Sequence, residues 1–452
     1  MKFDEFTDRL FEGARSAGFE ECEVYESRGE SFRVMVFEGK VDDYKVNTSF
    51  GLSFRGMKNG RMGYAYTEVL DEDAVSMLLR SAADNAAVIE SEDPQFIFAG
   101  AGKEDYKPVE AYYPALAQLT PARKIELTLE MEAAALRADP RITTVECCML
   151  QYGDGSVRIR NSRGLDLSER SNDLFAYLEP VAEADGKREE GHAYRITHDP
   201  DGLEPEAMAR EAAENALTKL GAAPVPSGSY DILLGNEAAG DMLSAFSDIF
   251  SADAAQKGLS LLKGRVGETI AAPCVTLMDD PHLRDGFASA GFDAEGVPTR
   301  TKAVIDGGVL GTLLHNLKTA AKDGTTSTGN AAKRSYKSPV GVSPFNFYVK
   351  PGDAPPEALM RRMGRGLMIT EVVGLHSGTD TVSGDFSLMG NGFVIEEGRR
   401  GRPVDQITIA GNFFMMLKAI EAVGSDLRFG LPGTGCVGSP SLWVRELSVA
   451  GK

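Results

Sequence analysis

Three polar side chains at the start of a predicted helix, Asn236, Glu237 and Asp241, have types that could serve hydrolytic chemistry. A zinc hydrolase needs at least three neutral or anionic ligands and a glutamate that takes a proton from the metal-bound water. Glu237 suits that base and Asp241 could ligate a metal, but Asn236 offers only an amide oxygen and the stretch has no histidine. Because zinc prefers imidazole or thiolate, we predict no metal here. We expect Asn236 to cap the helix and Glu237 to favour the helix dipole.

This stretch resembles a segment of the TldD/PmbA (TldE) family of bacterial and archaeal metalloprotease subunits. The TldD-type segment reads His-Glu-x-x-x-His and binds zinc, whereas Asn236 and Asp241 stand at the histidine positions here, as is typical of the PmbA-type subunit. Further similar segments follow in the same order at residues 257–260, 267–270, 292–299, 327–330, 384–387, 392–398, 409–412 and 447–451. The resemblance implies that this chain carries no cofactor and that zinc resides on a TldD-type partner.

The resemblance also implies a function in a complex that degrades or processes small unfolded peptides. This chain would be catalytically inactive alone and would supply structure and substrate surface to a zinc-bearing subunit. An extended peptide could pair with sheet edges, so that it is recognised through hydrogen bonds of its backbone. The alternative is a stand-alone homodimer that binds peptides without proteolysis. A self-sufficient hydrolase built from Glu237, Asp241 and His376 ranks last, because no spacing supports it.

A second polar cluster contains His376, Asp380 and Asp385, which we keep as candidates for substrate binding. A Ser–His–Asp triad is not predicted, because the Gly-x-Ser-x-Gly elbow is missing. The zinc-bearing subunit of the family draws a further cysteine ligand from near its C-terminus. Cys436 lies near that place, but its segment is shorter, so we expect a small buried side chain instead. His192 and His198 flank a predicted strand and are expected to face solvent.

Composition narrows the class of protein. The 452 residues carry 48 Lys and Arg against 67 Asp and Glu, a net charge of −19 that disfavours nucleic acid and anionic lipid as partners. The N-terminus lacks the apolar region of a signal peptide, and no apolar stretch is long enough to span a membrane. The five cysteines are scattered and include no Cys-x-x-Cys, which fits reduced thiols in a cytoplasmic protein.

The predicted elements give an α+β fold. Residues 1–91 and 121–223 read as two related helix–sheet–helix units, joined by a linker at 92–120, with the helices on one face of antiparallel sheet. Residues 224–452 are rich in glycine and short strands, and predict a β-barrel-like domain flanked by helices. Strands are predicted at 22–25, 31–38, 42–54, 60–67, 144–152, 156–161, 164–171, 175–182 and 191–197. Helices are predicted at 4–17, 71–88, 121–137, 204–220, 237–250, 356–365 and 412–423.

Overall fold

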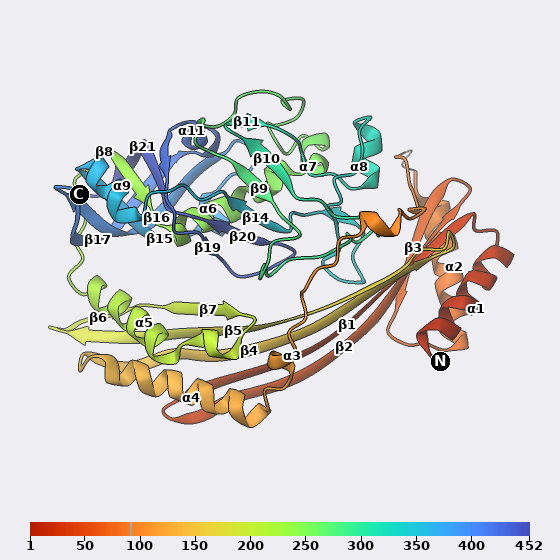
Figure 1. Cartoon of the computed structure of the whole chain (residues 1–452), viewed down its shortest axis with the longest axis horizontal. Helices are drawn as coiled ribbons and strands as arrows, with labels where there is room; N and C mark the ends of the chain where they lie inside the picture. The colour runs from red at the N-terminus through yellow and green to blue at the C-terminus, as the bar shows by residue number, and fades with distance from the viewer. Residues whose placement is uncertain (91–92) are drawn as a thin grey trace.

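A computed structural model, which describes residues 1–90 and 93–452, places a long curved sheet beneath a C-terminal domain (Figure 1). The sheet has seven strands in the order β3-β2-β1-β4-β5-β6, with β7 pairing to β5. The strands are β1 (Glu21–Phe37), β2 (Lys40–Lys58), β3 (Arg61–Thr67), β4 (Ile142–Asn161), β5 (Asp166–Ala184), β6 (Lys187–Glu190) and β7 (Ala193–Thr197). Both predicted units therefore contribute to one continuous sheet, because β1 pairs with β4.

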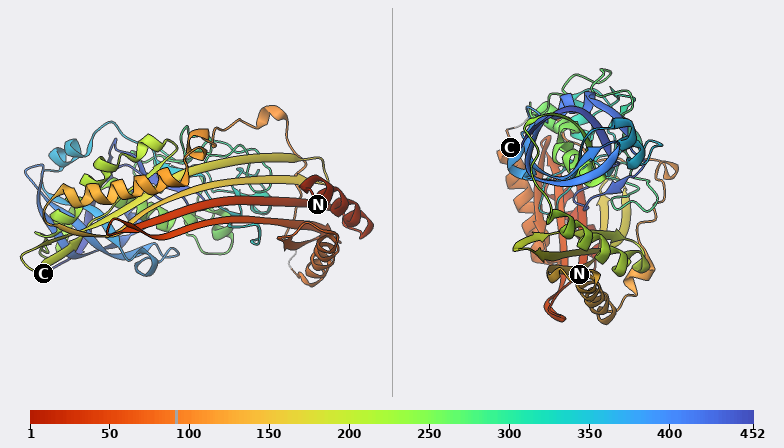
Figure 2. Two further views of the ribbon diagram at one scale, coloured as in Figure 1. Left: turned by 90° about the horizontal axis from the view of Figure 1, so that it is seen from below. Right: turned by 90° about the vertical axis from the view of Figure 1, so that its left-hand side faces the viewer.

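The helices of the N-terminal half lie on one face of this sheet, as predicted. The pair α1 (Phe3–Ser16) and α2 (Glu72–Val88) packs at one end, and the pair α4 (Pro121–Ala138) and α5 (Pro205–Lys219) packs at the other (Figures 1 and 2). Val24 of β1 lies in the core of the first pair and Val34 in the core of the second. Residues at even spacing share a face, so both pairs cover the outer face and leave the inner face to the C-terminal domain.

The long strands correct the sequence prediction, which divided β1, β4 and β5 into shorter pieces. Gly29 and Gly155, which lie between the predicted strands, are paired strand residues at the centre of the sheet. Gly29 also faces Ser49 of β2, and Gly155 faces Ser171 of β5. Small residues with extended backbones therefore cross the middle of the inner face, where a bulky side chain would reduce the space below the C-terminal domain.

The C-terminal domain contains a closed five-stranded barrel, which confirms the predicted fold class. Its ring is β17-β16-β15-β8-β21, closed by pairing of β17 with β21, and β18 (Ile420–Val423) adds to β21. The barrel strands are β8 (Gly228–Leu234), β15 (Gly366–Val373), β16 (Asp385–Glu396), β17 (Arg399–Asn412) and β21 (Leu442–Ala450). A second sheet has the order β11-β10-β9-β14-β20-β19, and β12 pairs with β13. Its strands, with that pair, are β9 (Leu277–Asp279), β10 (Lys302–Asp306), β11 (Val309–Leu310), β12 (Ala331–Ala332), β13 (Gly341–Val342), β14 (Asn346–Val349), β19 (Arg428–Phe429) and β20 (Cys436–Ser439).

The helices of this domain are short. They are α6 (Asn236–Phe246), η3 (Ser247–Phe250), α7 (Ala252–Gln256), α8 (Leu317–Lys322), α9 (Pro356–Met363), α10 (Leu375–Gly378) and α11 (Phe413–Lys418). The predicted linker contains η1 (Lys103–Asp105) and α3 (Pro114–Ala117), and η2 (Pro200–Leu203) precedes α5. The predicted boundary at 91/92 lies outside the described residues, and the domain limits stay predictions. No helix in the described part of the chain has the length and apolar character needed to cross a bilayer.

Candidate functional site

Helix α6 brings the stretch singled out in the sequence to the side of the domain that faces the sheet. It follows β8 directly, and Gly235 rather than Asn236 is its N-cap, which corrects the predicted capping role. The Asn236 amide is nevertheless fully engaged: its Oδ1 accepts from the Glu237 N–H at 2.8 Å, and its Nδ2 donates to the Asp426 carbonyl at 2.9 Å. Asn236 therefore ties the first turn of α6 to the segment before β19.

Glu237 contacts an imidazole and a guanidinium from other elements. Its Oε1 lies 3.0 Å from Nε2 of His192, and its Oε2 lies 3.6 Å from the Arg428 guanidinium. The prediction that His192 faces solvent is wrong, because its ring is only about a quarter exposed and contacts α6. The hydrogen bond to Glu237 raises the pKa of His192, although burial opposes that shift. Arg428 also packs over the Tyr194 ring, 4.4 Å from its centroid.

Asp241, one turn further along α6, has no hydrogen-bond or ion-pair partner among the described residues. Burial, followed by the charge of Glu237, raises its pKa to about 6. An unpaired carboxylate in such a place is costly to ionise. Asp241 therefore holds its proton more tightly than an exposed aspartate does.

The residues at this place do not fit a zinc ion. Both polar atoms of Asn236 are already used, and the guanidinium of Arg428 beside Glu237 would repel a cation. Across residues 1–90 and 93–452, no group of three or more His, Cys, Asp or Glu side chains is placed to hold a metal.

Two cavities meet at Glu237, between the sheet and the C-terminal domain. One, of about 290 Å³, includes Lys219 of α5 and Glu371 of β15, and the other, of about 300 Å³, includes Asp241. They share His192, Asn236, Glu237 and Arg428. Lys219 and Glu371 form an ion pair of 2.8 Å across the same gap. We call the five charged or titratable residues His192, Lys219, Glu237, Glu371 and Arg428 the junction.

The second predicted cluster has a local structural role. Oδ1 of Asp380 accepts from the N–H groups of Val382 and Ser383, and Asp385 accepts from the Asn412 amide at 2.8 Å. These carboxylates stabilise the turn before β16. His376 is exposed on α10. The two cavities at the junction are lined by other residues than Asp380, Asp385 and His376. The assignment of this cluster to substrate binding therefore stays a prediction.

Cys436 lies on β20 and is fully buried, as expected for a small packing residue. Its Sγ lies 3.5 Å from the Gly430 carbonyl. Burial raises the pKa of this thiol to about 12, so it stays protonated. A protonated thiol is a poor metal ligand and a poor nucleophile.

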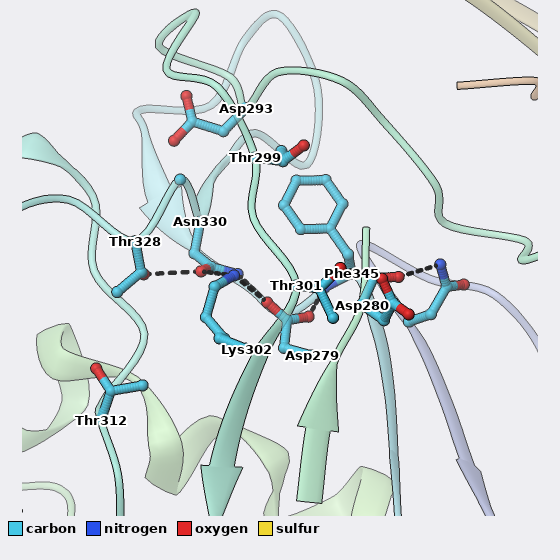
Figure 3. Close-up of polar contacts among 12 residues, drawn as sticks. Asp279, Asp280, Asp293, Thr299, Thr301, Lys302, Thr312, Thr328, Asn330 and Phe345 are labelled. Atoms are coloured by element: carbon cyan, nitrogen blue, oxygen red, sulfur yellow. Dashed lines mark hydrogen bonds and ion pairs between the residues drawn. The ribbon is translucent and has the colours of Figure 1, made fainter. Parts of the chain in front are cut away.

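A long loop between β9 and β10 covers another part of the inner sheet face, and a buried polar cluster anchors it (Figure 3). Asp279 accepts from Lys302 Nζ at 2.8 Å and from the Asn330 amide at 2.7 Å. The Phe345 N–H reaches the other oxygen of Asp279 at 2.7 Å. Asp279 is the last residue of β9, and this fully satisfied carboxylate has a structural role there.

Sequence reasoning missed most of the junction. Lys219, Glu371 and Arg428 come from three separate segments and carry no motif spacing that would bring them together. His192 is separated from Glu237 by 45 positions. The only signal available was the helical pattern of α5, which places Lys219 at its C-terminal end.

Comparison with known proteins places this architecture in a family. Models of the PmbA/TldA metallopeptidase match at domain 1 over residues 22–86, at the central domain over 114–220 and at the C-terminal domain over 227–451. The metalloprotease PmbA of Escherichia coli O157:H7 is 29% identical over 90% of this chain and 88% of its own length. A Thermotoga maritima protein, a suggested modulator of DNA gyrase, is 33% identical, with a TM-score of 0.91 over 99% of this chain and 100% of its own.

A further solved structure supports the fold alone. TldE from Thermococcus kodakarensis superposes with a TM-score of 0.89 over 99% of this chain and 100% of its own, at 21% identity. The matches together span the sheet, its helices and the barrel. The chain therefore belongs to the PmbA/TldD family of metallopeptidases.

Proposed function

We propose that this chain is the non-catalytic subunit of a two-chain peptidase. In this complex a zinc-bearing TldD-type relative cleaves extended peptides, and this chain supplies structure and part of the surface that holds the substrate. The observation that carries the proposal is that Asn236 and Glu237, at positions of the zinc motif of the TldD-type subunit, are both engaged by other groups of this chain. Asn236 is hydrogen-bonded to backbone groups, and Glu237 is engaged by the His192 imidazole and the Arg428 guanidinium, so neither side chain is available to a metal or to a metal-bound water.

The inner face of the sheet supports the part of the proposal that concerns substrate. Cavities lie between this face and the C-terminal domain, and polar side chains from both line them. An extended peptide in such a space would contact the polar side chains that point up from the sheet face, such as Asp173 and Tyr177. Pairing of its backbone would require an exposed strand edge. A folded protein would not enter, because each cavity is large enough for only a few residues of a peptide.

The first test separates this chain from its expected partner. Metal content by mass spectrometry and hydrolysis of an unstructured peptide are measured on the chain alone, on a TldD-type relative from the same source, and on the mixture. We expect zinc and chelator-sensitive hydrolysis only where the relative is present, with a higher rate in the mixture. About one zinc per chain and hydrolysis by this chain alone would overturn the proposal.

A pair of matched variants sharpens that test. Glu237→Gln in this chain should leave hydrolysis by the mixture within about twofold, because a neutral amide still accepts from His192. The equivalent change of the motif glutamate in the relative should abolish hydrolysis. Loss of hydrolysis with Glu237→Gln, in a complex that still assembles, would assign catalysis to this chain.

The second candidate function is a homodimer that binds peptides without cleaving them. The contacts of Glu237 with His192 and Arg428 favour it as much as they favour the two-chain peptidase, since neither function needs a metal in this chain. Sedimentation of the chain alone and with the relative distinguishes them. A stable homodimer that the relative does not disrupt would favour the binding protein.

A further inference from the structure

One face of β5 forms a wall shared by successive cavities. Alternate residues of a strand share a face, and Glu169, Ser171, Asp173 and Tyr177 of β5 follow that spacing. Glu169 lines a cavity of about 170 Å³, Ser171 and Asp173 line one of about 220 Å³, and Tyr177 lines the cavity of about 300 Å³ at Asp241. Residues of the segment from Gly430 to Thr434 also contribute to the lining of all three cavities.

The middle cavity contains a carboxylate without a partner. Asp173 makes no hydrogen bond or ion pair within the described residues. Its carboxylate lies over Gly153 of β4, where a Cβ would stand only 3.2 Å from Oδ2. Burial raises the pKa of Asp173 to about 6, so the group is charged at neutral pH but poorly solvated. A charge in such a place is stabilised by a cation that brings its own hydrogen-bond donors.

No lysine or arginine lines this cavity. Its second titratable group is His198, which stacks on Tyr113 at 4.1 Å and packs against Phe287. Burial lowers the pKa of His198, so its imidazole is neutral at pH 7. The prediction that His198 faces solvent is therefore wrong. The cavity thus carries a net negative charge, together with hydroxyl groups of Ser171 and Thr434.

We propose that this middle cavity binds the primary ammonium group of an extended peptide, either its N-terminal amine or a lysine side chain. The inference rests on the proposed function only in taking a peptide as the ligand. An ammonium has three N–H donors, which suit the Asp173 carboxylate and the neighbouring hydroxyl oxygens. Residues Gly286 to Ala290 of the loop that follows Asp279 form part of the cavity lining.

The position of Asp173 sets a register for the peptide. Tyr177 lies four residues further along β5, which corresponds to about 13 Å of strand. Four residues of an extended peptide cover nearly the same distance. A peptide whose ammonium sits at Asp173 and whose chain follows β5 therefore reaches the level of Tyr177, in the cavity shared with Glu237, after about four residues.

Binding is tested by fluorescence anisotropy on the isolated full chain, with three short peptides labelled at their C-termini. The first has a free N-terminus and no lysine, the second is N-acetylated without lysine, and the third is N-acetylated with one lysine. We expect the second to bind at least about tenfold more weakly than the better of the other two. Which of those two binds more tightly identifies the source of the ammonium.

The variant Asp173→Asn keeps the shape of the side chain and removes its charge. It should reduce binding of the ammonium-bearing peptide to the level of the acetylated one and leave the acetylated peptide unchanged. Asp201→Asn, an exposed carboxylate on η2, is the matched control for the loss of one negative charge. Thermal unfolding of both variants reports whether each is folded.

Three results would overturn the inference. They are equal affinity for all three peptides, an equal loss for all three in Asp173→Asn, and no binding of any peptide to the wild-type chain. None of them contradicts the two-chain peptidase, whose test depends on zinc and hydrolysis in the presence of the relative. Conversely, hydrolysis by this chain alone would contradict that proposal while leaving the ammonium site in place.

Discussion

Two of the contacts between the sheet and the C-terminal domain differ in the burial of their charged side chains. The first, which we call the buried contact, consists of Glu23, Arg55, Glu295 and Lys333. Arg55 donates to Glu23 at 2.8 Å and to Glu295 at 3.1 Å, and these side chains are at most 8% exposed. Lys333 reaches Ser53 at 2.7 Å and lies over the Tyr25 ring. The second contact is the junction, whose ion pairs are about a quarter exposed.

The difference separates a fixed connection from one that responds to solution conditions. In the buried contact, loss of one partner leaves a charge without solvent, which is strongly destabilising. Burial there lowers the pKa of Lys333 to about 7, with the Arg55 charge adding to the effect. In the junction, water reaches every pair, so each is weak and can exchange partners. The cavities next to Glu237 therefore border the more adaptable contact.

The largest effect is expected from Arg55→Met, which breaks the buried contact. It leaves Glu23 and Glu295 unpaired in the interior and should lower the free energy of unfolding by about 3–5 kcal/mol, measured by urea denaturation. Arg137→Met removes the exposed partner of Glu206, whose side chain is also exposed, and should cost less than about 1 kcal/mol. Equal losses in the two variants would remove the distinction between the contacts.

Asp241→Asn should stabilise the protein next to the junction. Burial raises the pKa of Asp241 from its ordinary value of 3.8 to about 6. The folded state therefore binds this proton more tightly than the unfolded state, and stability falls as pH rises from about 4 to 6. The variant should gain about 1–2 kcal/mol at pH 7.5 and nothing at pH 4, measured by thermal unfolding. A gain at pH 4 would show that charge is not the cause.

His192→Gln tests the pH response of the junction with a hydrogen bond retained. The folded-state pKa of His192 is raised by Glu237. Its contribution is fully present below the unfolded value of about 6.5 and is lost as pH rises through the raised folded value. We expect wild-type stability to fall by about 1 kcal/mol across that window and the glutamine variant to lack this decrease. Parallel pH curves for the two proteins would contradict the assignment.

The smallest effect is expected from Lys219→Met, which removes the pair with Glu371. Burial would raise the pKa of Glu371, but the Lys219 charge and hydrogen bond outweigh it and hold the pKa low. The variant should lose about 0.5–1 kcal/mol, less in high salt. The double variant Lys219→Glu with Glu371→Lys should recover most of the loss, and failure of the swap would indicate packing rather than charge.

The elements of the fold were largely predictable from the sequence, because amphipathic periods are local. The helices containing Phe6, Leu78 and Leu127 have apolar residues three and four apart, and each lies within two residues of its predicted limits. The continuity of the long strands was not predictable, because glycine weakens a strand pattern and is equally typical of a turn. The sequence around Gly29 and Gly155 would look the same if each glycine ended a strand. In the structure they pair with each other in the middle of β1 and β4.

The candidate site was predictable only in part. Asn236, Glu237 and Asp241 share one helix, so their spacing could be read directly. Their partners could not, because pairing of Glu237 with His192 and Arg428 depends on how β7 and β19 meet across the cleft. Asp173 likewise reads as an ordinary polar strand residue until β4 places Gly153 beneath it.

The order in which the barrel closes has a consequence for synthesis of the protein. Strand β21 pairs with β8, joining Val449 to Gly228, and the same strand also pairs with β17. Contacts between such distant segments form late and slowly. During translation β8 therefore leaves the ribosome long before its neighbour exists, with an unpaired edge of Ile232, Leu233 and Leu234 that favours aggregation. We expect expression at lower temperature, or with more chaperone, to increase the yield of soluble protein.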